Sequence, residues 1–546
     1  MNMRNFLTIL LLLPLIANAQ STPAFDTLIH ELVTPDGPGA AWLVAKDGKV
    51  IARGARGMAD LEKQEKLTPE HVFRIGSITK QFTAVAILQL VEAGKLKLAD
   101  PISKYVEGTP ATWNKITVQH LLDHSSGIKS YTGMEAFDTA TQQKRVSTAQ
   151  LLEFFKNEPL EFEPGTKWNY NNSGYVLLGM ILEKVSGRTY GEYVEEEIFK
   201  KLGMRNSSYG RDDVKVDRHA TGYMKAGEKW EVAAPLSMTW PYSAGALLST
   251  VDDLHTWNTA VMSGKLIGKD LLQKAHTELV LPNGDSTRYG FGWSLSRLQG
   301  SRTIEHGGGI NGFVTNAIYL PDEDLYAVVL TNQEADLADD LSARLAAIAI
   351  GRPYEFKEIT LTADQLKEYE GVYMNEDSMK RFIRAEENGL TSQRAGGSRH
   401  ELKPDAKDHF FFDGSLNQIT FHRNGSGAID GLTMHNRAFG DQRWTRLDET
   451  LPAEEKAIEL SADELQRFTG VYELKPGFNI TVTRDGQQLM GQATGQSAFE
   501  LFPSAPMRFF LKAVDAQIQF HADATGKVDR MVLFQGGGEM EGMKVE

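Results

Sequence analysis

The stretch RIGSITKQFTA, residues 74–84, places a serine three positions before a lysine at the start of an apolar segment. The segment continues to Val91 with apolar residues on nearly every helical face, which is typical of a helix at the centre of a core. Ser77 and Lys80 then lie on neighbouring positions of one face. Free N–H groups at a helix start favour negative charge, which suits an oxyanion formed at a serine ester. The pattern predicts either a nucleophilic Ser77 beside Lys80, or a capping serine beside a lysine that reaches solvent.

A second Ser-x-x-Lys pattern lies at Ser126 and Lys129, in the stretch HSSGIKS. Gly127 separates the two residues, and this composition is typical of a turn. A turn leaves the distance between serine and lysine unconstrained, whereas a helix defines it. The pair at positions 77 and 80 is therefore the stronger candidate.

The pattern Tyr-x-Asn also occurs twice. Tyr170 and Asn172 follow the turn-forming stretch EPGTKWNY and precede the apolar stretch SGYVLLGMILEKVSG. Functional side chains concentrate on loops held at the edge of core elements. Tyr373 and Asn375 lie in a strand-like stretch instead, so we expect them to be structural. Taken alone, Tyr170 also fits a half-buried packing residue.

A single His-x-Gly pattern occurs in HGGGINGF, residues 306–313. The glycines run into the strand-like stretch FVTNAIYL, and glycine at a strand start lets another backbone or a substrate come close. His306, Gly308 and Gly309 are therefore candidate site residues. Taken alone, His306 also fits a surface histidine whose hydrogen bonds are satisfied.

The stretch HLLDH, residues 120–124, is a competing candidate. Two histidines four apart on a helix can bind zinc on one face, with an acid between them as base. Asp123 stands where such patterns carry glutamate. The stretch LLDHSSGI also fits a helix that ends in a glycine turn, with His124 bonded to the loop. We expect no metal here.

The whole chain has 546 residues, a net charge of −14 and no cysteine. Such a length suits about two to four domains. Nucleic acid is not an expected partner, because phosphate binding needs a basic patch. The absence of cysteine excludes disulfides and thiol catalysis.

The first residues have the pattern of a secretory signal peptide, predicted for residues 1–19. Arg4 precedes an apolar run from Phe6 to Ile16, and Ala-Asn-Ala at 17–19 fits a cleavage site, so the mature chain is expected to start at Gln20. The run is too short for a bilayer, which needs ~20 apolar residues. We expect a periplasmic or secreted protein with no transmembrane segment.

The C-terminal third contains a repeat. LTADQLKEYEGVY at 361–373 matches LSADELQRFTGVY at 460–472, and the same offset relates QITFH at 418 to QIQFH at 517. Alternating apolar and polar residues in each copy predict antiparallel strands. Each copy has the size of a small β-barrel or sandwich, which protects its edges by closing. We predict a tandem duplication at 361–450 and 460–546, after a linker at 353–360.

The part before residue 352 has no such repeat. Strand-like stretches such as AAWLVAKDGKVIARGARG and FVTNAIYLPDEDLYAVVLTN lie at its two ends, with mostly helical stretches between them. This order predicts an α+β domain at residues 20–352, in which the two ends form one antiparallel sheet and the helices pack on it.

In this order, Ser77-x-x-Lys80, Tyr170-x-Asn172 and His306-x-Gly308 resemble the motifs of the penicillin-recognising serine hydrolases. The likeness is greatest to the branch with class C β-lactamases, D,D-peptidases, D-aminopeptidases and family VIII esterases. The flanking stretches LLDHSSGI, SAGALLSTVDDLHTW and YGFGW are similar to that branch too. The C-terminal repeats resemble the lipocalin-like barrels of its D-aminopeptidases.

The resemblance implies a mechanism without metal or cofactor. Ser77 attacks an acyl carbonyl and forms an ester, with Lys80 as a cation beside it. Tyr170 relays the proton, and Lys80 is expected to lower the pKa of its phenol. Asn172 binds the amide or acyl side of the substrate. The N–H groups of Ser77 and Gly309 form the oxyanion hole.

The chain departs from this family pattern at His306. β-Lactamases and many D,D-peptidases carry lysine there, a permanent cation for the substrate carboxylate, whereas free histidine titrates near pH ~6.5. A mostly neutral imidazole anchors a carboxylate less well. This difference favours esterase or D-aminopeptidase chemistry over β-lactam hydrolysis.

The leading functional hypothesis is a serine acyl hydrolase acting on small peptides, D-residues among them, or on esters. A β-lactamase or D,D-carboxypeptidase is one alternative, and a slowly acylating sensor or binding protein is another. The polar insertion at residues 131–147 is expected to be either a lid or wall of the substrate site or a solvated loop. The substrate and the oligomeric state are left open.

Overall fold

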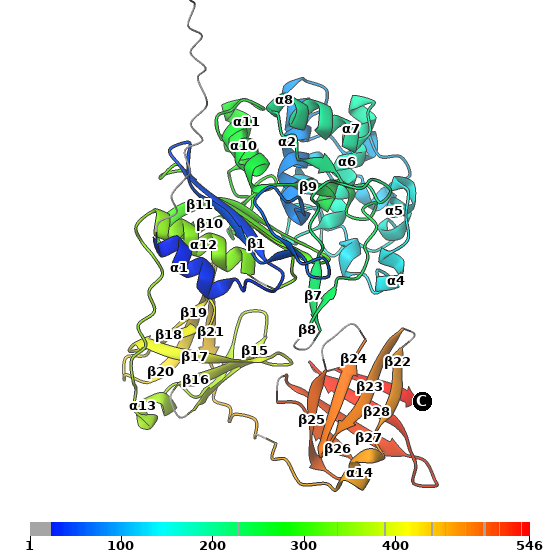
Figure 1. Cartoon of the computed structure of the whole chain (residues 1–546), viewed down its shortest axis with the longest axis vertical. Coiled ribbons are helices and arrows are strands. Elements are labelled where there is room, and N and C mark those ends of the chain that lie inside the picture. The colour runs from blue at the N-terminus through cyan, green and yellow to red at the C-terminus, as the bar shows by residue number, and fades with distance from the viewer. Residues whose placement is uncertain are drawn as a thin grey trace, which may run out of the picture.

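The computed structural model describes residues 23–226, 229–335, 337–386, 389–437, 440–453, 455–475, 477–494, 498–512, 514–536 and 538–545. They form a mixed domain of helices and one large sheet, called here the N-terminal domain (23–352), followed by two closed barrels (Figure 1). The predicted signal peptide at 1–19 lies outside the described residues. Within the described part of the chain, no helix is long and apolar enough to cross a membrane.

The large sheet has six antiparallel strands in the order β10-β11-β12-β13-β1-β2. Their bounds are β1 (Ala40–Lys46), β2 (Lys49–Arg56), β10 (Ser294–Leu298), β11 (Ser301–Ile310), β12 (Phe313–Leu320) and β13 (Leu325–Thr331). Ala40 pairs with Thr331, so β1 from one end of the domain adjoins β13 from the other. The predicted sheet from the two ends of the α+β domain is confirmed.

Helices cover both faces of this sheet (Figure 1). The longer ones are α1 (Pro23–Leu32), α2 (Thr79–Glu92), α6 (Asn172–Ser186), α10 (Val251–Met262) and α12 (Leu337–Ala349). Successive side chains of a strand point to opposite faces. Leu43 packs into the core cluster that holds α2, whereas its neighbour Val44 packs into the cluster that holds α1 and α12. Both faces of the sheet are therefore buried.

The remaining elements of the N-terminal domain are short. The strands are β3 (Met58–Asp60), β4 (Glu65–Lys66), β5 (Phe73–Arg74), β6 (Ser208–Tyr209), β7 (Tyr223–Ala226), β8 (Lys229–Val232) and β9 (Leu247–Ser249). The helical turns and helices are η1 (Gly76–Ile78), η2 (Ile102–Lys104), η3 (Ala111–Trp113), α3 (Val118–Leu122), η4 (Tyr131–Gly133), α4 (Thr139–Gln142), α5 (Thr148–Phe155), α7 (Tyr190–Val194), η5 (Glu195–Phe199), α8 (Lys200–Leu202), α9 (Tyr242–Gly245) and α11 (Lys269–Ala275).

Helix α2 is the central core helix that its apolar sequence predicts. Every residue from Thr79 to Leu88 is buried. Phe82 stacks on Trp257 of α10 with ring centroids 3.8 Å apart. Ser77 precedes α2, in the 3₁₀ turn η1, so the helix proper starts two residues later than the nucleophile candidate.

Two closed eight-stranded antiparallel barrels follow. Barrel 1 consists of β14 (Gly371–Met374), β15 (Lys380–Ala385), β16 (Leu390–Arg394), β17 (Arg399–Ala406), β18 (His409–Phe412), β19 (Gln418–Arg423), β20 (Ile429–Asn436) and β21 (Gly440–Arg446). Barrel 2 consists of β22 (Gly470–Lys475), β23 (Phe478–Asp485), β24 (Gln488–Ala493), β25 (Phe499–Ala505), β26 (Arg508–Phe510), β27 (Ala516–Ala522), β28 (Val528–Gln535) and β29 (Gly538–Lys544). Short capped helices precede them, α13 (Ala363–Lys367) and α14 (Ala462–Gln466). The predicted pair of small all-β barrels is confirmed.

Barrel 1 contacts the N-terminal domain through Arg437, which follows β20. Its Nη1 donates a hydrogen bond of 2.6 Å to Glu305 of β11, and its Nη2 pairs with Asp339 of α12. The side chains of Arg437 and Glu305 are 8% and 5% exposed. Because Glu305 directly precedes His306, the contact joins barrel 1 to the strand that carries the His-x-Gly pattern.

Candidate active site

The structure places Ser77 and Lys80 side by side under the substrate pocket. The Nζ of Lys80 lies 3.0 Å from the Oγ of Ser77, 2.8 Å from Oδ1 of Asn172 and 3.0 Å from the carbonyl oxygen of Ala244. Lys80 is fully buried, so it does not reach solvent. The alternative of a snorkelling lysine is therefore wrong.

Burial lowers the pKa of Lys80 well below its usual value. A neutral amine has two N–H donors and one lone pair. Oδ1 of Asn172 and the carbonyl of Ala244 accept hydrogen bonds and cannot donate, so they bind the two N–H groups. In the neutral form of the amine the lone pair would face the hydroxyl of Ser77, which is the geometry that a general base needs.

Tyr170 lies directly above this pair. The Nζ of Lys80 is 4.7 Å from the centroid of the Tyr170 ring. Burial raises the pKa of Tyr170, and the hydroxyl of Ser77 opposes this only in part. The expectation that Lys80 lowers this pKa is wrong, because desolvation penalises the phenolate more than its surroundings stabilise it. At neutral pH Tyr170 is a phenol, which can donate a proton.

Asn172 begins α6 and links the lysine to the pocket wall. Its Oδ1 accepts from Lys80, and its Nδ2 donates to Oγ1 of Thr132 at 3.0 Å. Asn171 caps the helix by accepting from the N–H of Gly174. The side-chain amide of Asn172 therefore both orients the amine of Lys80 and lines the pocket.

Strand β11 approaches the nucleophile closely because of two glycines. β10 pairs with β11 only as far as Glu305, which leaves the edge of the following residues free to face η1. A Cβ on Gly308 would lie 2.1 Å from the carbonyl oxygen of Ile75, and one on Gly76 would lie 3.0 Å from the nitrogen of Gly309. Any larger residue at these positions would separate the two backbones. Ser77 and Gly309 both line the pocket, as a shared oxyanion hole requires.

His306 is buried and has both ring nitrogens bonded within the protein. Nδ1 lies 2.6 Å from the carbonyl oxygen of Gly307, so it carries the proton and donates it. Nε2 is then the acceptor of the Tyr289 hydroxyl at 2.8 Å. Burial, with a smaller contribution from the charge of Lys80, lowers the pKa of His306 to about 3. The imidazole is neutral and has no N–H to offer a substrate.

Two aromatic neighbours of this site, His124 and Tyr289, are absent from the sequence-based set of site residues. The ring of His124 lies 4.5 Å from that of Tyr170 and 4.6 Å from that of Tyr289, between centroids. Its Nδ1 accepts from the backbone N–H of Asn171 at 3.1 Å. The flanking stretches LLDHSSGI and YGFGW contain both residues, but nothing in their spacing indicates that they meet.

The zinc alternative at HLLDH lacks its geometry. Helix α3 ends at Leu122, so His120 and His124 do not share a helix face. The Nδ1 of His120 accepts from the backbone N–H of Thr117. Among the residues that the structure describes, no group of three or more His, Cys, Asp or Glu side chains could hold a metal ion.

The other duplicated motifs lie apart from this centre. The Oγ of Ser126 accepts from the backbone N–H of Ile128, and Lys129 pairs with Glu158. Tyr373 lies inside barrel 1, where its hydroxyl donates to the carbonyl of Tyr369 at 2.7 Å. These residues have structural contacts of their own.

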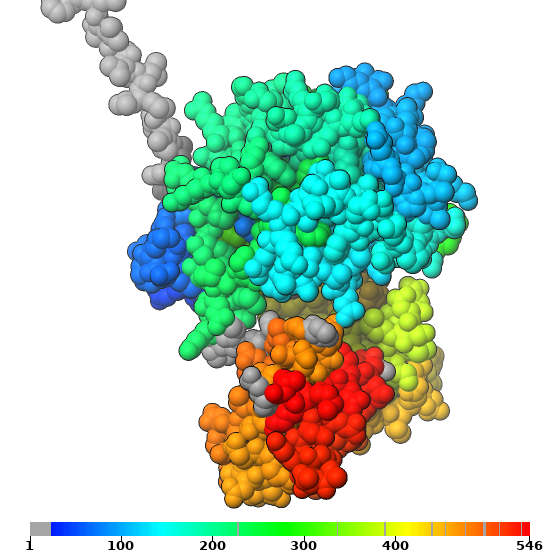
Figure 2. All heavy atoms as spheres, turned by 90° about the vertical axis from the view of Figure 1, so that its right-hand side faces the viewer, coloured from blue at the N-terminus to red at the C-terminus, as the bar shows by residue number. Residues whose placement is uncertain are grey.

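The pocket above Ser77 has a volume of about 140 Å³. No lysine, arginine, aspartate or glutamate is among its lining residues, which are Gly76, Ser77, Tyr131, Thr132, Phe137, Gln142, Asn172, Leu236, Pro241, Ala244, Gly245, Gly309, Ile310 and Asn311. Four of them belong to the insertion at 131–147, which therefore forms a wall of the pocket. Glu135 of the insertion pairs with Lys475 of barrel 2, which lies below this part of the domain (Figure 2).

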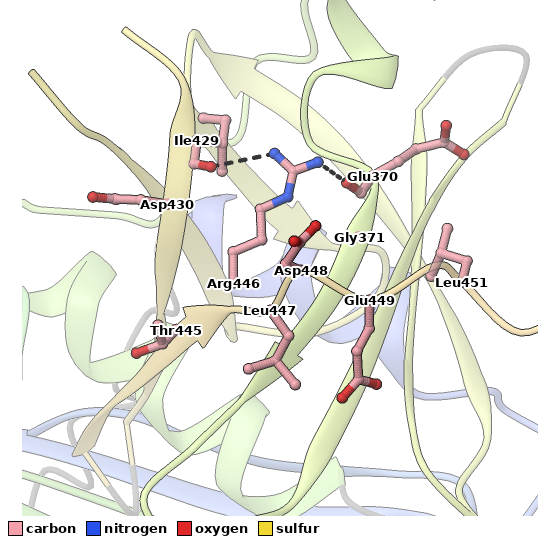
Figure 3. Close-up of a pocket in the computed structure, with 10 residues that line it drawn as sticks. All are labelled: Glu370, Gly371, Ile429, Asp430, Thr445, Arg446, Leu447, Asp448, Glu449 and Leu451. Atoms are coloured by element: carbon pink, nitrogen blue, oxygen red, sulfur yellow. Dashed lines mark hydrogen bonds between the residues drawn. The ribbon is translucent and has the colours of Figure 1, made fainter. Parts of the chain in front are cut away.

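A larger cavity of about 670 Å³ lies on the outside of barrel 1 (Figure 3). Its lining contains none of the candidate site residues. Arg446, at its centre, donates to the backbone carbonyls of Glu368, Ile429 and Glu370. The guanidinium is occupied by the barrel itself, so this cavity is not a second catalytic centre.

Comparisons with known proteins agree with this fold. The beta-lactamase family model matches residues 25–352, and a domain of unknown function, DUF3471, matches residues 454–544. Penicillin-binding protein 4* of Bacillus subtilis (strain 168) is 29% identical over 405 residues, which are 69% of this chain and 89% of that protein.

Two solved structures are similar to the chain. One is the octameric penicillin-binding protein homologue from Pyrococcus abyssi, with a TM-score of 0.55, 26% identity, and coverage of 77% of this chain and 99% of the other. The second is a D-stereospecific amidohydrolase from Streptomyces sp., with a TM-score of 0.53, 29% identity, and coverage of 59% and 97%. Since the family model spans more than half of the sequence, the chain belongs to the beta-lactamase family and is a serine hydrolase of the β-lactamase-related type.

Proposed function

We propose that this protein hydrolyses small amides or esters, peptides with D-residues among them, whose acyl part has no free carboxylate, through an acyl-enzyme on Ser77. The single observation that carries the proposal is the buried Lys80, whose amine lies 3.0 Å from the hydroxyl of Ser77 and is held there by two oxygen acceptors. A serine hydroxyl is a weak nucleophile unless an adjacent base takes its proton.

In the acylation step, the Oγ of Ser77 attacks the carbonyl carbon and Lys80 accepts the proton. The negative charge that forms on the carbonyl oxygen binds the N–H groups of Ser77 and Gly309. The bond to the leaving group then breaks, and the phenol of Tyr170 protonates the leaving nitrogen or oxygen. Tyr170 regains its proton from the Lys80 ammonium, so the amine returns to its neutral form.

In the deacylation step, water attacks the carbonyl carbon of the ester and loses one proton, which passes through Tyr170 to the amine of Lys80. The carbonyl of the ester again binds the two backbone N–H groups. Breaking the bond to Oγ releases a carboxylic acid and returns the proton to Ser77. The ring cluster of His124, Tyr289 and His306 surrounds Tyr170 and restricts its orientation throughout.

The pocket favours an acyl part that has no free carboxylate. A carboxylate would need a cation or several N–H donors, but no charged residue lines the pocket and His306 has used both ring nitrogens. Tyr131, Phe137 and Leu236 offer apolar contact, and the small volume suits a short acyl group. The Streptomyces relative, named as a D-stereospecific amidohydrolase, supports amides with D-residues as substrates.

The alternative function is that of a β-lactamase or D,D-carboxypeptidase. The name of the Bacillus relative, penicillin-binding protein 4*, supports acylation by β-lactams. Their carboxylate has no cationic anchor in this pocket, so we expect acylation to be slow. A sensor that acylates and does not turn over is the third candidate.

The test is a fluorophosphonate probe on the wild type and on two variants, Ser77→Ala and Ser126→Ala. We expect mass spectrometry to find the label on Ser77 in the wild type and in Ser126→Ala. Labelling that avoids Ser77 in the wild type would sink the mechanism. Rates with p-nitrophenyl acetate, D-alanyl p-nitroanilide and a chromogenic cephalosporin then rank the candidates, and a single burst without turnover would identify a sensor.

We also propose that the chain is exported and that the domains lie at 20–352, 361–450 and 460–546. The N-terminal pattern at residues 1–19 supports export. N-terminal sequencing of the protein from a periplasmic fraction should begin at Gln20. A chain that keeps Met1 would refute processing.

A further inference from the structure

Barrel 1 contains a buried arginine on the inner face of β15. Ile383, two residues further along the strand, belongs to the core cluster of the barrel, so Arg381 points to the same interior. Arg381 is only 4% exposed. A fully buried guanidinium needs partners for its charge and for its N–H groups.

The partners of Arg381 are too few. Its Nη1 donates to the Oγ of Ser392 at 2.6 Å, and its Nη2 contacts the sulfur of Met434 at 3.1 Å, which is a weak acceptor. The guanidinium lies 4.7 Å from the centroid of the Trp444 ring. Its Nε is buried without any partner. Of five N–H groups, one has an oxygen acceptor.

The charge of Arg381 is also uncompensated. Burial lowers its pKa to about 10, and the nearby positive charge of Arg394 adds to this effect, so the group is still protonated at neutral pH. Within the described part of the chain, no carboxylate forms an ion pair with it. Arg437 shows the contrast, since its buried guanidinium pairs with two carboxylates.

The two ends of barrel 1 differ, and Arg381 lies at the end that α13 does not close. At one end Leu366 of α13 packs with Phe410 and Phe421 and closes the interior. Arg381 is the second residue of β15, so it lies at the opposite end, beside the connection between β14 and β15. That end faces the N-terminal domain, because Leu416 packs against the cluster that holds α1 and α12, and Arg437 pairs with Asp339 of α12.

Barrel 2 has different residues at the corresponding positions. Strand pairing aligns Arg381 with Ile480 and Ser392 with Gly491, because Tyr373 opposite Arg381 matches Tyr472 opposite Ile480. Trp444 likewise corresponds to Gly542. A Cβ on that glycine would lie 2.9 Å from the side chain of Leu474, so an apolar residue fills the space. The buried guanidinium is specific to barrel 1.

We propose that barrel 1 binds a small carboxylate anion at Arg381. A carboxylate accepts two parallel N–H bonds from one guanidinium edge, which would satisfy Nε and compensate the charge. Trp444 and Met434 provide apolar contact for a short side chain. Hydrolysis of an ester or amide releases a carboxylate, so the reaction would supply a ligand of this class. This source of the ligand rests on the proposed function, whereas binding at Arg381 does not.

The experiment is a titration of the full-length protein with acetate and, separately, with its neutral isostere acetamide, at constant ionic strength with chloride, which is also titrated alone. Binding is followed by the emission of Trp444, obtained as the difference between the wild type and Trp444→Phe, and by the melting temperature. We expect acetate and not acetamide to change both, since a ligand that binds only the folded state stabilises it. Arg381→Met should abolish the response, and Arg443→Met, an exposed neighbour of Trp444 on the same strand, should keep it.

Two results would overturn the proposal. The first is an acetate response that is equal in Arg381→Met and the wild type. The second is the lack of any difference between acetate and acetamide in the wild type, a comparison that needs no variant of Arg381 to fold. A chloride response as strong as that of acetate would refute the preference for carboxylates. Since these readouts ignore catalysis, the Ser77→Ala protein should give the same titration even if the proposed function fails.

Discussion

Two regions of this molecule bury a cation against an aromatic ring. In the N-terminal domain, the amine of Lys80 lies 4.7 Å from the ring centroid of Tyr170, and in barrel 1 the guanidinium of Arg381 lies 4.7 Å from that of Trp444. Lys80 has three oxygen neighbours, whereas Arg381 has one. The amine can lose its proton to escape the cost of burial, but a guanidinium keeps its charge. The first arrangement therefore suits a base, whereas the second keeps a buried charge that no carboxylate of the described residues pairs with.

The largest effect is expected from removing the first cation. Lys80→Met should lower kcat/KM for p-nitrophenyl acetate by about 10²–10⁴, because the general base is lost. Arg381→Met is the matched change in barrel 1. It should leave kcat/KM within about twofold of the wild-type value, because Arg381 does not contact the transition state. Steady-state kinetics of both variants check this. Equal losses would mean that the two cations are not independent.

The ring above each cation provides the next comparison. Tyr170→Phe keeps the aromatic face and removes the acid, so kcat/KM for D-alanyl p-nitroanilide, which reports acylation, should fall by about 10² or more. The loss with p-nitrophenyl acetate should be smaller, because p-nitrophenolate leaves without protonation. Trp444→Phe should leave both rates unchanged. A uniform loss on both substrates would contradict the role of Tyr170 as proton donor to the leaving group.

A third buried cation, Arg437, is the case in which two carboxylates pair with the charge. Arg437→Met leaves Glu305 buried without its partner, and breaking a buried pair costs about 3–5 kcal/mol of folding or docking free energy. Since Glu305 adjoins His306, we expect kcat/KM to fall by about tenfold, the size of a modest positioning effect. Urea unfolding and kinetics measure both. Glu305→Gln with Arg437→Met should restore part of the stability if the unpaired carboxylate is the cause.

The effect that is smallest at neutral pH, on stability, concerns the neutral histidine of the site. The pKa of His306 is about 3 in the folded state and ~6.5 in the unfolded chain, so the unfolded state binds one more proton between these values. Stability therefore falls as the pH decreases from ~6.5 toward 3, by about 1.4 kcal/mol per pH unit for this group. His306→Asn should reduce this slope. Burial raises the pKa of Asp123 to about 6, so its contribution to stability changes with pH in the opposite direction. That contribution is the same in the wild type and in His306→Asn. Identical slopes of stability against pH in the two proteins would therefore contradict the lowered pKa of His306.

The sequence alone predicts much of this protein, because the relevant signals are local. Helical periodicity makes the segment after Ser77 a core helix and sets Ser77 next to Lys80. The repeat near residues 361 and 460 predicts the duplicated β-domains, since alternation and turn residues recur at one offset. The glycines that precede the stretch FVTNAIYL predict a close approach of another backbone. The structure has this contact between Gly308, near the end of β11, and Ile75.

The tertiary structure decided what depends on burial and on contacts between distant segments. The pKa of Tyr170 rises although a lysine is its neighbour, because desolvation depends on every element packed around the ring. His124 follows α3 and Tyr289 precedes β10, and their rings meet only in the folded domain. In the sequence, Arg381 is an ordinary strand arginine. In the closed barrel its side chain is buried, and no carboxylate of the described residues pairs with it. Local pattern specifies which face is buried, whereas only the folded chain specifies which charges face one another there.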